Sequence, residues 1–99
     1  MAEKNNAATG DPDPIRVLLV EDMELEAELT SSHLRRHGIT HVVQRVETDE
    51  AMRVALREFR PTIILSDFSL PKFDGLRALE IARECSPETP FLFVSGTIG

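Results

Sequence analysis

The chain has 99 residues, 41% of them hydrophobic and 28% charged, which is typical of one folded domain and too apolar for a disordered chain. Its net charge of −6 argues against binding to nucleic acid or to an anionic membrane, and its single cysteine excludes a fold held by internal disulfides. No apolar run approaches the roughly 20 residues of a membrane span, so we expect a cytoplasmic protein.

A flexible leader is predicted over residues 1–14. Apart from Met1 this segment has no large aliphatic or aromatic side chain, and Gly10, Pro12 and Pro14 interrupt regular structure. Such a segment cannot bury enough apolar surface to offset the entropy lost on ordering. The folded domain is therefore predicted to span residues 15–99.

The domain opens with a strand and a helix. The run RVLLVE at 16–21 lacks polar alternation, which favours a strand covered on both faces. A helix is predicted over 23–37, with an apolar stripe that includes Leu25 and Leu29. Gly38 follows at the place where a glycine commonly ends a helix.

A second strand and helix follow. The run HVVQRV at 41–46 mixes polar and apolar residues, as expected of an edge strand. Thr48 is predicted to cap the next helix, which Pro61 ends. The apolar face predicted for this helix consists of Ala51, Met52, Ala55, Leu56 and Phe59.

The third strand is predicted at 62–66 and leads to Asp67, after which a loop reaches Asp74 as the cap of a third helix. A fourth strand is predicted at 91–95. The apolar face predicted for the third helix consists of Leu76, Leu79 and Ala82, with Ile81 or the stem of Arg83 as alternatives for a further member. Strands alternating with helices through short loops indicate an α/β fold with a parallel sheet and right-handed crossovers.

Polar groups follow three of these strands. Glu21 and Asp22 come after the first strand, Asp67 after the third, and Ser95 ends the fourth. Because functional groups of open parallel sheets collect at the carboxyl ends of the strands, we expect these four to converge. On its own Asp22 is equally typical of a helix cap. Only the combination of three carboxylates and a hydroxyl at the ends of three strands points to a functional site.

Three adjacent carboxylates repel one another unless a cation neutralises them. Oxygen ligands favour Mg²⁺ or Mn²⁺ over zinc, and Mg²⁺ commonly binds one or two carboxylates together with phosphate oxygens. A carboxylate beside such a metal can attack phosphorus as a nucleophile. The pattern therefore predicts Mg²⁺-dependent phosphoryl transfer.

The motifs VLLVED, IILSDFSLPKFDG and PFLFVSGTIG carry a resemblance to a known family. Residues 15–99 resemble about the first two thirds to three quarters of a response-regulator receiver domain, the phospho-acceptor module of two-component signalling. The resemblance implies a flavodoxin-like, doubly wound parallel sheet with strand order 2-1-3-4. The fifth strand and the last two helices of the family pattern are missing after residue 99.

The resemblance also implies roles for individual residues. Asp67 would be the phosphorylated aspartate, and Asp22 would be a direct ligand of Mg²⁺. Glu21 would hold metal-bound water, and the backbone carbonyl of Ser69 would complete the protein ligands. Ser95 takes the place of the switch hydroxyl, which turns toward the phosphoryl group.

One departure from the family concerns the phosphate-binding lysine, which ends the fifth strand. The chain stops before that strand, and Lys72 lies in a loop where a solvated lysine is expected. The domain is thus expected to be incomplete at its C-terminus. With no fifth strand, residues 91–95 would form an exposed apolar edge, and with no last helix Leu25 and Leu29 would be uncovered. From both features we expect self-association.

The resemblance implies a histidine kinase or histidine phosphotransfer protein as phosphoryl donor and a downstream domain or protein as reader. The chain would catalyse its own phosphorylation and dephosphorylation and is not expected to be an enzyme in the usual sense. The alternative is a receiver-like scaffold that binds a partner without phosphorylation. A nucleotide- or flavin-binding enzyme is disfavoured because the first strand–helix turn contains no glycine.

Overall fold

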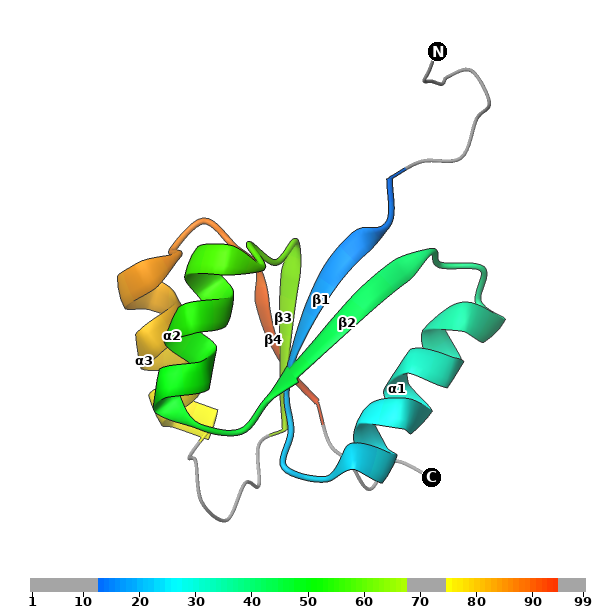
Figure 1. Ribbon diagram of the computed structural model, residues 1–99, viewed down its shortest axis with the longest axis horizontal. Coiled ribbons are helices and arrows are strands. Elements are labelled where there is room, and N and C mark those ends of the chain that lie inside the picture. Colours follow the sequence, from blue (N-terminus) through cyan, green and yellow to red (C-terminus); the bar gives the residue numbers. More distant parts are fainter. Residues whose placement is uncertain (1–12, 68–74, 95–99) are drawn as a thin grey trace.

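The computed structural model describes residues 13–67 and 75–94, which form a four-stranded parallel sheet with three helices (Figure 1). The strand order is β2-β1-β3-β4, as predicted. In chain order the elements are β1 (Ile15–Val20), α1 (Glu24–Arg36), β2 (His41–Val46), α2 (Asp49–Glu58), β3 (Ile63–Asp67), α3 (Gly75–Cys85) and β4 (Phe91–Val94).

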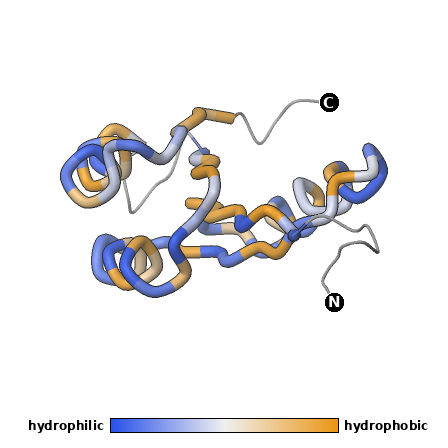
Figure 2. Tube along the Cα trace, turned by 90° about the horizontal axis from the view of Figure 1, so that it is seen from above, coloured by the Kyte–Doolittle hydropathy of each residue, from blue (hydrophilic) through white to orange (hydrophobic). Residues whose placement is uncertain are grey.

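The helices cover the two faces of the sheet unequally. Seen from above, α2 and α3 lie together on one face, and α1 lies on the other (Figure 2). The main hydrophobic core is between the sheet and the α2–α3 pair. Its buried members are Leu18, Val20, Val46, Met52, Ala55, Leu56, Ile64, Ala78, Ile81 and Ala82.

The strand β1 is central and is buried on both faces. Leu18 and Val20 belong to the core beneath α2 and α3, and the intervening Val17 and Leu19 are also almost completely buried. Side chains alternate between the faces of a strand, so an unbroken apolar run can fill both. The predicted strand covered on both faces is confirmed.

The predicted cap and core face of α2 are also confirmed. The Thr48 hydroxyl accepts a hydrogen bond from the backbone N–H of Ala51 at 3.1 Å, which satisfies one of the free donors in the first turn. Met52, Ala55 and Leu56 are buried in the core.

The buried face of α3 agrees with the prediction at Ile81 and Ala82 and differs from it at Leu76. Leu76 is 55% exposed, and the buried residues are Gly75, Ala78, Ile81 and Ala82. These positions share one helical face, and their mostly small side chains suit close packing against α2. The third-helix cap predicted at Asp74 lies outside the described residues.

The two leucines of the stripe predicted on α1 are uncovered, as expected. Leu25 and Leu29 are 66% and 56% exposed, and Ala27 is the buried residue of this helix. Ala27 lies on the side of α1 that faces β2, with Ser31 and Val43 lining the same groove. The two leucines lie off that contact line. Among residues 13–67 and 75–94, no helix is long and apolar enough to cross a membrane.

Candidate functional site

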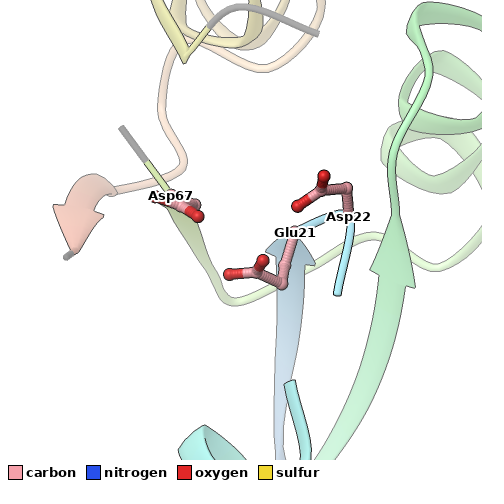
Figure 3. A group of neighbouring side chains, drawn as sticks. All are labelled: Glu21, Asp22 and Asp67. Atoms are coloured by element: carbon pink, nitrogen blue, oxygen red, sulfur yellow. The ribbon is translucent and has the colours of Figure 1, made fainter. Parts of the chain in front are cut away.

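The sheet brings three acidic residues to one edge. In the parallel pair of β1 and β3, Val20 is the register partner of Ser66. Glu21 follows Val20 and Asp67 follows Ser66, and Asp22 comes next after Glu21 at the start of the turn into α1. The three side chains therefore gather at the carboxyl ends of neighbouring strands, as predicted (Figure 3).

The three carboxyl groups lie close enough to share one cation. One oxygen atom from each of Glu21, Asp22 and Asp67 lies within 4.8 Å of the other two. Glu21 is buried, with 4% of its surface exposed, and Asp22 and Asp67 are partly buried. The predicted convergence of these carboxylates is thus present in the described part of the chain.

The pKa of Glu21 is strongly affected by this arrangement. Its pKa rises from an ordinary value of 4.5 to about 7, chiefly because burial penalises the charged carboxylate. The backbone N–H of Met23, which donates to Glu21 Oε2 at 3.2 Å, opposes the rise. The charges of Asp67 and Asp22 and a hydrogen bond with Asp22 add to it. The acidic site thus favours binding of a proton or another cation.

The helix-cap explanation of Asp22 does not hold. Met23, and not Asp22, occupies the N-cap position of α1, and its side chain makes no capping hydrogen bond. The carboxylate of Glu21 instead accepts from the N–H of Met23 at this helix start. Asp22 is therefore placed beside two other carboxyl groups without serving as the N-cap residue.

The donor set fits a hard divalent cation. The cluster offers carboxylate oxygens alone, which suit Mg²⁺ or Mn²⁺ better than zinc. The charges of Asp67 and Asp22 add to the rise that burial causes in the pKa of Glu21, and a cation would relieve that repulsion. Both observations agree with a magnesium site that uses Glu21, Asp22 and Asp67.

Two predicted site residues, Ser69 and Ser95, lie outside the described residues, as does Lys72. The structure nevertheless describes the strand that leads to Ser95. Its last residue, Val94, is the register partner of Asp67 across β3 and β4. The carboxyl end of β4 therefore adjoins the acidic site.

Sequence reasoning missed Arg45, which lies near the end of β2. Its Nη1 atom donates a hydrogen bond of 3.1 Å to the backbone carbonyl of Glu21. The same atom lies 3.6 Å from Glu47 Oε1. The only signal in the sequence was a charged residue near the end of a strand that mixes polar and apolar residues, and that signal indicated no partner.

The histidines do not join the acidic site. His41 contacts the Ser31 hydroxyl through Nε2 at 2.8 Å and the carbonyl of Ile39 through Nδ1 at 2.9 Å. His33 and His37 stack on each other at the end of α1, with ring centroids 4.6 Å apart. Within the described ranges, the three carboxylates are the one group of at least three residues placed to hold a metal.

Comparisons with known proteins agree on one protein family. The family model described as response regulator receiver domain matches residues 17–98. The chain is 37% identical over 82 residues to transcription factor SKN7 of Saccharomyces cerevisiae, and this match covers 83% of the chain and 13% of SKN7. It is 35% identical over 80 residues to the uncharacterized transcriptional regulatory protein YvcP of Bacillus subtilis, covering 81% of the chain and 32% of YvcP.

A solved structure shares the fold. The response regulator from Hahella chejuensis superimposes with a TM-score of 0.71 at 22% identity, over 86% of this chain and 66% of that one. The chain thus spans about two thirds of that solved chain and less than a third of the curated YvcP regulator.

Proposed function

Because the chain belongs to the response regulator receiver family, we propose that it is a phospho-acceptor that receives a phosphoryl group on Asp67 in a Mg²⁺-dependent reaction. The observation that carries this proposal is the approach of the Glu21, Asp22 and Asp67 carboxylates to within 4.8 Å. Charge crowded at one sheet edge, beside a carboxylate able to attack phosphorus, is what such a reaction requires.

In the proposed reaction a carboxylate oxygen of Asp67 attacks the phosphorus of a phosphohistidine on a kinase or phosphotransfer protein. A P–O bond forms, the P–N bond breaks, and the imidazole leaves with the electron pair of that bond. The product is an acyl phosphate on Asp67. The chain supplies the acceptor and its surroundings, so it promotes its own modification and is not an enzyme that acts on other molecules.

Glu21 and Asp22 are proposed to hold the cation. Bound Mg²⁺ would neutralise the acidic site and attract the oxygens of the incoming phosphoryl group. Asp22 is more exposed than Glu21 and can offer an oxygen toward solvent, whereas the buried Glu21 suits contact with metal-bound water. Their positions after β1 fix both side chains on the side of Asp67 (Figure 3).

Phosphorylation is proposed to act through the surface around the acidic edge. The Asp67 end of β3 pairs with the end of β4, and the phosphate would add charge at this junction. A downstream domain or protein would read the changed surface. In the alternative function, a scaffold, the partner would bind equally well without the phosphate.

The test is labelling with acetyl phosphate in the presence of Mg²⁺. The parent chain should incorporate one phosphoryl group, and Asp67→Asn should incorporate none, because the amide is a poor nucleophile. Asp13→Asn, the same change at an exposed position in the stretch before β1, should label like the parent. Equal labelling of the Asp67→Asn chain would overturn the proposal, and a parent that does not label would favour the scaffold.

A further inference from the structure

The turn from β1 into α1 carries Asp22 and has few means of holding its position. The sheet ladder runs one step past β1, where the N–H of Glu21 donates to the carbonyl of Val46 at 3.0 Å. Beyond that bond, α1 starts at Met23 without a side-chain cap. The geometry of the acidic site therefore depends on whatever secures the Glu21–Met23 backbone.

Besides the Glu21–Val46 bond and the helix bond from the N–H of Ala27 to the carbonyl of Met23 at 3.1 Å, two hydrogen bonds secure this backbone in the described structure. One runs inside the turn, from the N–H of Met23 to the carboxylate of Glu21. The other comes from outside it, from the guanidinium of Arg45 on β2 to the carbonyl of Glu21. A donor with a full charge makes a stronger bond to a carbonyl than a neutral donor does. Arg45 thus links the turn to the rigid sheet.

We propose that Arg45 is a positioning residue for the cation site. Its guanidinium fixes the peptide between Glu21 and Asp22, and it thereby sets where the Asp22 carboxylate stands relative to Asp67. Mg²⁺ demands near-ideal octahedral geometry, so a small shift of one ligand is costly. The effect on Mg²⁺ rests on the proposed function, whereas the effect on the backbone does not.

Arg45 is suited to this task by its place and its contacts. It is the residue before Val46, and its register partner in β1 is Leu19, so its side chain starts two residues before the peptide that it holds. Glu47 Oε1 lies 3.6 Å from the same Nη1 atom and forms an ion pair with the guanidinium. The side chain of Arg45 is 29% exposed, which shields the bond in part from water.

The first experiment needs no metal. Hydrogen exchange of the Met23 amide is compared in the metal-free parent, Arg45→Met, Arg45→Lys and Arg57→Met. The control Arg57 is an exposed arginine near the end of α2, which leads from the carboxyl end of β2 back to the start of β3. Arg45→Met should speed exchange at Met23 several-fold, and Arg57→Met should not. Unchanged exchange in Arg45→Met would overturn the proposal.

The second experiment measures Mg²⁺ affinity and the phosphorylation rate of the same chains. Arg45→Met should weaken Mg²⁺ binding about tenfold, the lower end of the effect of outer partners of metal ligands. Arg45→Lys should recover part of the affinity because its ammonium can still donate. The rate at saturating Mg²⁺ should stay near that of the parent, which separates positioning from loss of fold.

The outcomes separate the two proposals. Should Arg57→Met weaken Mg²⁺ binding as much as Arg45→Met, the effect is one of net charge and the positioning role is wrong. Should the parent itself bind no Mg²⁺ while Arg45→Met speeds exchange at Met23, the proposed function fails and the backbone role of Arg45 stands. If Arg45→Met does not fold, the Mg²⁺ affinity of Arg45→Lys is the test. An affinity within twofold of that of Arg57→Met supports a donor role for residue 45. A loss of Mg²⁺ affinity equal to that of a metal-ligand variant overturns the proposal.

Discussion

Val20 and Ser66 are partners in the register of β1 and β3, and the residue that follows each of them carries a carboxyl group of the acidic site. This pairing explains why Glu21 and Asp67, 46 positions apart in the chain, interact electrostatically. It also ties the pKa of Glu21 to the fold, because the same strands that bury its side chain bring Asp67 beside it.

The raised pKa of Glu21 predicts a pH dependence of stability in the metal-free protein. The folded pKa is about 7 against an ordinary 4.5, so the folded state binds more protons than the unfolded state between these values. The contribution of Glu21 to the free energy of unfolding is therefore most favourable below about pH 4.5. It is lost as the pH rises to 7 and above.

Urea unfolding of the parent and of Glu21→Gln checks this sign. The neutral amide should make the variant more stable relative to the parent at pH 8 than at pH 5, by on the order of 2 to 3 kcal/mol. Glu58→Gln, at the exposed end of α2, should show no comparable trend. A stability difference that stays constant with pH would contradict the assigned cause.

Removal of Asp22 should weaken cation binding. Asp22→Ala deletes a direct ligand from a site with few protein oxygens, so most of the Mg²⁺ affinity should be lost in a calorimetric titration. Asp13→Ala serves as the control for charge. Ser95→Ala should bind Mg²⁺ like the parent, because the role expected of its hydroxyl is toward the phosphoryl group. Undiminished binding by Asp22→Ala would exclude Asp22 as a ligand.

The corrected core face of α3 has a direct test in stability. Ile81→Ala removes a fully buried side chain and should lower the free energy of unfolding by about 3 kcal/mol. Leu76→Ala, which the apolar pattern would rank as equally severe, should cost less than about 1 kcal/mol because that side chain is 55% exposed. Equal costs in denaturant unfolding would restore the face predicted from sequence.

The position of β4 predicts self-association. This strand is one of the two outer strands of the described sheet, and its residue Leu92 is 52% exposed. An apolar edge strand can pair with another chain, so oligomers should appear by light scattering at tens of micromolar, about the range where such contacts form. Leu92→Lys places a charge on the edge and should shift the population toward monomer. A clean monomer of the parent would show that the edge is not used.

The sequence by itself determined the order of the elements and the position of the acidic edge. The apolar runs of β1 and β3 and the cap at Thr48 are local signals, readable within a few residues. Because β1 and β3 are parallel, their carboxyl ends then lie at the same edge of the sheet. For that reason the sequence is enough to predict that Glu21, Asp22 and Asp67 lie together.

Only the tertiary structure decided which residues of α1 and α3 are fully buried and what holds the acidic turn. In α1 the packing against β2 buries Ala27, a contact that the leucine spacing did not indicate. The bond from Arg45 to the carbonyl of Glu21 joins residues 24 positions apart. Every residue has a backbone carbonyl, so the residue types do not indicate which one Arg45 contacts. The contact is defined only once β1 and β2 lie side by side.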